Sequence, residues 1–194
     1  TCFITKQTRA QATCGAGFTK AAINWDWQYF KVTNLPASPL RYMFGKNNVR
    51  FSWRGTGTNT LIALTTTDRH TGSVGSMGTG NDIGFRVGNG SDTLVFDQEV
   101  TNLSFSVYDV DSTQALNVSA YNAANVLQNV TLTRVAGTSL SATVTSTNPT
   151  MTANNTRVPF TSNTATVNVT IPTAVNRVIL RFTKGGPAAC FDTV

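Results

Sequence analysis

The segment Val100-Thr101-Asn102-Leu103-Ser104-Phe105-Ser106-Val107-Tyr108-Asp109-Val110-Asp111 decides the fold class. Apolar and polar residues alternate along it with a period of two, which predicts a β-strand with one buried face. Leu103, Phe105 and Val107 share that face, and Asp109 follows on the same side, with Asp111 two residues further. An unpaired buried carboxylate is costly, so these acids need a metal, a cation or several hydrogen bonds. The segment therefore predicts a sheet with a polar site at its rim.

The composition of the chain favours an all-β protein. Only 12% of the 194 residues are charged, and Glu99 is the single glutamate. Helix surfaces are normally built from Glu, Lys, Gln, Arg and Ala, whereas this chain is rich in Thr, Asn, Ser and Gly. We therefore expect exposed strands and turns rather than helices.

Short segments of strand-like sequence recur along most of the chain. They cover residues 23–30, 49–54, 61–64, 93–96, 100–111, 115–121, 126–133, 139–145, 156–160, 165–171, 175–182 and 189–194. Between them we predict a turn at Asp97-Gln98 and a long irregular stretch over residues 65–92, which is rich in glycine. Strands at this spacing predict a β-sandwich or barrel over residues 23–194, with residues 1–22 as a tail or a donor strand.

The charge is strongly positive, at +6 with a pI of about 9.6. The basic residues are scattered singly and form no nucleic-acid-binding motif, so we expect no nucleic-acid partner. A basic surface of this kind suits polyanionic glycans or anionic cell surfaces. No run of about 18 apolar residues is present, so we expect no membrane span.

The three cysteines indicate an extracellular location. Cys2 and Cys14 are placed to close a short loop, worth about 3 kcal/mol by the chain-entropy relation. Alternatively, Cys190 pairs with one of them and ties the termini together. An odd count also permits an intermolecular bond.

Several motifs give the chain a family resemblance. They are Asn24-Trp25-Asp26-Trp27, Val49-Arg50-Phe51-Ser52-Trp53, Leu94-Val95-Phe96-Asp97, the Val100–Asp111 segment and a terminal strand carrying Asp192. Together they resemble the jelly-roll-like β-sandwich domains of secreted bacterial surface and adhesin-type proteins. The resemblance implies a jelly-roll-like antiparallel β-sandwich that serves adhesion, surface display or fibre building without catalysis. Lectin-like relatives often bind calcium.

The acids of the central segment are the candidate metal ligands. Asp109 and Asp111 lie about 6.6 Å apart if the strand is extended, and paired carboxylates suit Ca²⁺. Further oxygen ligands are available at Asp26, Asp82, Asp192 and Asn81. Two alternatives stay open. Asp109 pins a loop through hydrogen bonds, or the two acids act as the carboxylate pair of a glycoside hydrolase.

Aromatic residues and the single histidine are candidate ligand contacts. Trp25, Trp27 and Tyr29 share one strand face, where they form either a sugar-stacking platform or part of the core. His70 lies in the glycine-rich stretch. No Gly-x-Ser-x-Gly nucleophile motif accompanies it, so we predict no enzyme activity.

These observations favour a non-enzymatic extracellular surface domain for assembly or adhesion. In one form it is a fibre subunit, joined by adding its N-terminal segment to an open sheet edge of a neighbour. In the alternative form it is a calcium-dependent, lectin-like glycan-binding module. A glycoside hydrolase is a distant alternative. The expected partners are further copies of the chain, or a glycan or protein of the cell surface.

Overall fold

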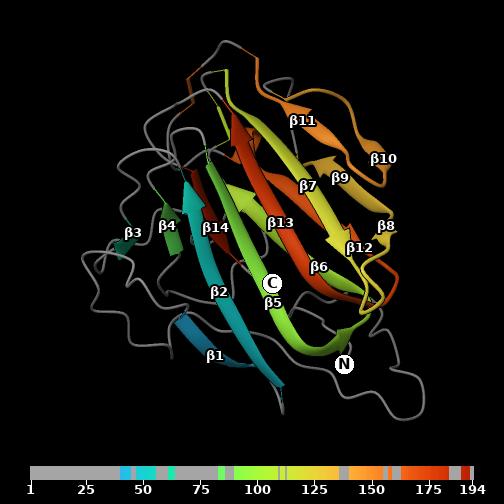
Figure 1. Ribbon diagram of the computed structural model, residues 1–194. Coiled ribbons are helices and arrows are strands. Elements are labelled where there is room, and N and C mark those ends of the chain that lie inside the picture. Colours follow the sequence, from blue (N-terminus) through green and yellow to red (C-terminus); the bar gives the residue numbers. More distant parts are fainter. Residues whose placement is uncertain are drawn as a thin grey trace, which may run out of the picture.

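The structure is a computed structural model of two antiparallel β-sheets (Figure 1). It describes residues 40–44, 47–55, 61–63, 83–85, 90–108, 110–111, 113–135, 140–154, 157–158, 163–183 and 189–192; strands β1–β4 and β14 are described by their backbone alone. The two antiparallel sheets confirm the predicted all-β antiparallel sandwich. Within the described ranges no helix has the length and apolar character needed to cross a bilayer.

The first sheet has the strand order β1-β2-β5-β13-β7-β11, and β8 pairs with the last two residues of β7. Its strands are β1 (Leu40–Phe44), β2 (Asn47–Gly55), β5 (Gly90–Val100), β7 (Ala115–Tyr121), β8 (Leu127–Gln128), β11 (Thr150–Thr152) and β13 (Val175–Thr183). In Figure 1, β2, β5, β13 and β7 lie side by side in front of the second sheet.

The second sheet has the strand order β10-β9-β12-β6-β14-β4-β3. Its strands are β3 (Leu61–Ala63), β4 (Ile83–Phe85), β6 (Leu103–Tyr108), β9 (Val130–Arg134), β10 (Val144–Ser146), β12 (Val167–Ile171) and β14 (Ala189–Asp192). A short 3-10 turn at Asn163–Ala165 leads into β12.

Most consecutive strands in the second half of the chain cross between the sheets, as in jelly-roll sandwiches, whereas the pairs β7–β8 and β9–β10 each stay within one sheet. β5, β7, β11 and β13 lie in the first sheet, while β6, β9, β12 and β14 alternate with them in the second. One crossing is very short: only Asn129 separates β8 from β9. The segment 126–133, which we predicted as one strand, is therefore two strands in different sheets.

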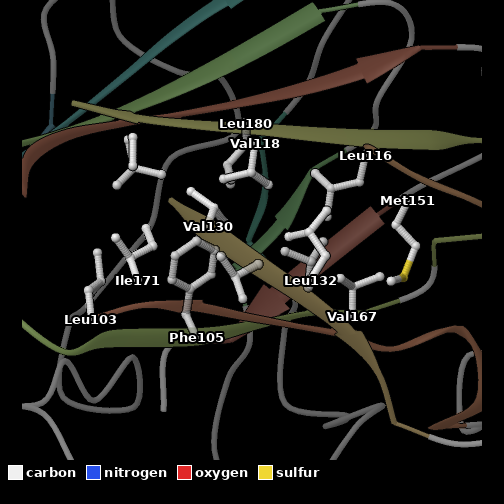
Figure 2. Packing of buried hydrophobic residues seen from close by; sticks show 14 of the residues in the cluster. Leu103, Phe105, Leu116, Val118, Val130, Leu132, Met151, Val167, Ile171 and Leu180 are labelled. Carbon is white, nitrogen blue, oxygen red and sulfur yellow. The ribbon is translucent and has the colours of Figure 1, made fainter. Parts of the chain in front are cut away.

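The core lies between the two sheets and is filled by the apolar faces of alternating strands (Figure 2). Leu103, Phe105 and Val107 on β6 are at most 4% exposed, as the period of two predicts. Side chains from β7 and β13 face them from the first sheet, among them Val118 and Leu180. Burial of this kind contributes roughly 25 cal/mol per Å² of apolar surface, so the two inner faces hold the sandwich together.

Several predicted boundaries are wrong. β5 continues through Asp97-Gln98, and the turn to β6 falls at Thr101-Asn102, where Asn102 has a φ of 53°. The predicted irregular stretch 65–92 contains β4 and the start of β5. Residues 157–158 are not a strand, and Leu140 forms only an isolated bridge with Ala153. Strands β1 and β11 were not predicted.

Candidate functional site

Asp111 is the predicted site residue whose side chain the structure describes. It follows β6 and is 2% exposed. Its Oδ2 accepts a hydrogen bond of 2.8 Å from the backbone N–H of Val158, and its carbonyl oxygen accepts one of 2.9 Å from the N–H of Gln114. The carboxylate thus holds the segment around Val158 against the end of β6.

The turn after Asp111 has two unusual features. Thr113 has a φ of 72°, which is uncommon for a β-branched residue and marks a conformation that the surroundings impose. Gln114 is fully buried, and neither of its side-chain polar atoms forms a hydrogen bond with the described residues. Backbone bonds still fix the turn, because the carbonyl of Gln114 accepts from the N–H of Ala153 at 2.8 Å.

In this turn the Asp111 carboxylate holds a distant segment of the chain in place through a hydrogen bond. The bond between Asp111 and Val158 joins residues 47 positions apart, so this acid has the pinning role that we had weighed for Asp109. Among the described residues, no group of three His, Cys, Asp or Glu side chains is placed to hold a metal ion. Calcium binding by the turn stays a prediction.

The strand register separates Asp192 from Asp111. Asp192 pairs with Ser106 of β6, and Cys190 pairs with Tyr108. β14 therefore runs back along the strand, away from the turn that begins after Tyr108. The register does not bring Asp192 to Asp111.

The other predicted site residues lie outside the described residues. They are the acids Asp26, Asp82 and Asp109, the aromatic residues Trp25, Trp27 and Tyr29, His70, and the cysteines Cys2 and Cys14.

A second carboxylate, Asp92 on β5, lies inside the sandwich. It shares the inner face of β5 with Leu94 and Phe96 and is 1% exposed. Apart from the adjacent backbone N–H of Thr93, which lies outside ordinary hydrogen-bond geometry, no donor among the described residues reaches either carboxylate oxygen. Burial raises the pKa of the Asp92 carboxyl well above its usual value, and the backbone N–H of Thr93 lowers it only in part. Asp92 is thus a core acid that favours its neutral form.

The outer face of the first sheet carries a fixed guanidinium at Arg181. Arg181 Nη1 donates to Asn117 Oδ1 at 3.2 Å and to Ser119 Oγ at 2.8 Å. These acceptors are themselves held: Ser119 Oγ donates to Asn148 Oδ1 at 2.7 Å, and Asn117 Nδ2 donates to Thr150 Oγ1 at 3.0 Å. The network fixes the position of one arm of the guanidinium.

Arg177, four residues earlier on β13, is fixed in a different way. Its guanidinium carbon lies 4.2 Å from the centroid of the Tyr121 ring, and its Nη2 donates to Asn125 Oδ1. Asn125 has a φ of 62° in the turn after β7, a conformation that asparagine tolerates better than most residues. Stacking and hydrogen bonding together orient this second cation.

Sequence reasoning missed both features, although signals for them were present. Asp92 precedes Leu94 and Phe96 with the same period of two that singled out Asp109. Likewise, Arg177 and Arg181 alternate with the apolar residues of β13, which predicts a cationic outer face.

Comparisons with known proteins add no relative. The sequence matches no protein-family model, and neither a curated protein nor a solved structure matches it.

Proposed function

We propose that the protein is a non-catalytic extracellular domain that assembles with further copies of itself by strand addition. The observation that supports this proposal most directly concerns β6, which lies inside the second sheet. β12 pairs with β6 over Leu103–Val107, but β14 pairs with it only over Ser106–Tyr108. Within the described chain, Leu103–Phe105 thus has a strand neighbour on one side only.

A half-paired inner strand is a suitable acceptor for an extended segment. The N–H and C=O groups on the side of β6 that has no strand neighbour among the described residues would form a template for another chain, and main-chain hydrogen bonds would supply the affinity. The candidate donor is the segment 1–22 of a neighbouring copy, which contains the apolar pair Phe3-Ile4.

Proline scanning of the full chain tests this proposal. Replacing Ile4 and Lys6 by proline removes two N–H donors from the candidate donor, whereas the matched variant with Ile4→Val and Lys6→Arg keeps them. We expect concentration-dependent oligomers, measured by light scattering, for the wild type and the matched variant but not for the proline variant. Equal association of all three proteins would contradict strand addition by this segment.

Hydrogen exchange of the backbone amides tests separately whether β6 is the acceptor strand. When association is induced by raising the protein concentration, the amides of Leu103–Phe105 should gain protection from hydrogen exchange in the wild type. In the proline variant their protection should stay at its dilute value. Protection gained only at other strands would place the interface elsewhere.

A further inference from the structure

We propose that the outer face of the first sheet binds an anionic polysaccharide, with Arg177 and Arg181 contacting its sulfate or carboxylate groups. We refer to the surface formed by β2, β5, β13 and β7 on this side as the arginine face. It faces the viewer in Figure 1 and is distinct from the half-paired strand β6 in the second sheet. The inference is independent of the assembly proposal.

The strand register arranges cations on this face in two rows. Arg177 pairs with Val95 of β5, which pairs with Arg50 of β2, and Arg50 pairs with Arg41 of β1. The second row lies four residues further along the strands, where Arg181 of β13 pairs with Ser91 of β5, which pairs with Arg54 of β2.

The spacing of these rows follows from sheet geometry, because directly paired residues share a face. The two rows lie about 13 Å apart along the strands, and β2 and β13 lie about 10 Å apart across the sheet. Arg50, Arg54, Arg177 and Arg181 therefore occupy the corners of a rectangle, which suits a ligand with repeated negative charges.

The guanidinium groups keep their charge available for such a ligand. Within the described residues, the groups that contact Arg177 and Arg181 are neutral: Tyr121, Asn125, Asn117 and Ser119. The exposed acids Asp97 and Glu99 follow Val95 at one end of β5, and Glu99 Oε1 accepts a hydrogen bond from the N–H of Ala123 at 2.7 Å. Fixed neutral partners orient a cation without cancelling its charge, so less entropy is lost when an anion binds.

The chemistry of this face favours a polysaccharide over other polyanions. Guanidinium groups match sulfate and carboxylate groups through paired N–H donors. Single-stranded nucleic acids need exposed aromatic rings on which bases stack. The ring of Tyr121, the aromatic side chain described on this face, is covered by Arg177. A membrane surface favours inserted apolar side chains, whereas the apolar residues Val95 and Ile179 on this face are partly buried and lie among arginine, asparagine, serine and threonine.

Binding of heparin to the full chain tests the proposal, with dextran as the neutral control. We expect Arg177→Gln and Arg181→Gln each to weaken heparin binding about tenfold, as for loss of a charge-assisted hydrogen bond. Arg157→Gln removes the same charge from an exposed residue outside both sheets and should have little effect. Arg181→Lys keeps the charge but loses the planar fork, so it should weaken binding less than Arg181→Gln.

Three results of the binding experiments would overturn the proposal: no binding of heparin, equal weakening by Arg157→Gln, or tighter binding of single-stranded DNA or phosphatidylserine vesicles through the same arginines. Chemical-shift mapping on the wild type provides a test that does not depend on the variants folding. Heparin oligosaccharides should shift the amides of Thr93, Asn117 and Ser119, and shifts confined to the second sheet would also overturn it.

Discussion

At the scale of single residues, Asp92 is the most consequential side chain. A carboxyl group inside an apolar interior loses its hydration and stays neutral unless a cation or donors replace the water. Asp92 lies in register with Leu180 of β13 and Trp53 of β2, in the middle of the first sheet. Its ionisation is therefore coupled to the stability of the whole sandwich.

We expect Asp92→Asn to raise the melting temperature at pH 7. The pKa of Asp92 is higher in the folded than in the unfolded protein. The protonated carboxyl therefore contributes its full stability to the fold below the ordinary pKa of 3.8, and this contribution is lost as the pH rises through the folded-state pKa. The difference between variant and wild type should therefore shrink toward pH 3. Thermal melts from pH 3 to 8 check this, and a gap that stays constant with pH would show that Asp92 is not ionising.

The bond between Asp111 and Val158 gives a second prediction. Asp111→Ala leaves the Val158 N–H without its acceptor and should lower the free energy of unfolding by about 1–3 kcal/mol. Asp111→Asn keeps an acceptor oxygen and should cost less. Urea denaturation of the two variants measures the difference, and equal losses would exclude the hydrogen bond as the cause.

Calcium binding is tested on the same residue. If Asp109 and Asp111 bind Ca²⁺, adding the ion should raise the melting temperature of the wild type, because a ligand that binds only the folded state stabilises it. Asp111→Asn should largely remove that increase. An unchanged melting temperature of the wild type with calcium and with chelator would leave Asp111 with its pinning role alone.

At the scale of elements, the tight turn between β5 and β6 depends on one backbone conformation. Asn102 adopts the left-handed region, and its N–H donates to the carbonyl of Pro172 at 3.4 Å. Asn102→Gly should be close to neutral, whereas Asn102→Ala should cost about 1–2 kcal/mol, because alanine keeps the Cβ that crowds the following carbonyl but lacks the polar side chain with which asparagine offsets that crowding. Gln98→Ala at an exposed position of β5 is the control in urea denaturation. A loss with glycine as large as with alanine would mean that the side chain, not the backbone, matters.

The elements that the sequence predicted correctly are those with one buried face. β6, β7, β12 and β13 show a clear period of two because their inner residues fill the core. Edge strands such as β11, with three residues, are too short to show a period. The split between β8 and β9 was missed because both halves are rich in apolar residues and only a change of partner sheet separates them. Long-range pairing of this kind leaves no local pattern.

The candidate site was predictable only in part, because its contacts also join segments that lie far apart in the sequence. The alternation of β6 indicated a buried acid after the strand, and Asp111 is buried. Its partner Val158 could not be predicted, because the contact depends on how distant segments pack at the rim. The rows of the arginine face likewise depend on which strands pair with β5.

At the scale of the whole molecule, the two sheets should unfold as one unit, since their inner faces form one core. Leu180→Ala in the first sheet and Leu132→Ala in the second should each lower the free energy of unfolding by about 2–5 kcal/mol. Tryptophan fluorescence and far-ultraviolet circular dichroism should report coincident urea midpoints for both variants. Separate transitions would show that the sheets are independent.

The crossing of strands between the sheets has a consequence for biosynthesis. β5 receives its partner β13 only when the ribosome has added residues 175–183, so Leu94 lacks its neighbour on that side until Val178 has been translated. The strands β1, β2 and β5 on one side and β7 and β11 on the other can therefore join into one sheet only after β13 has left the ribosome.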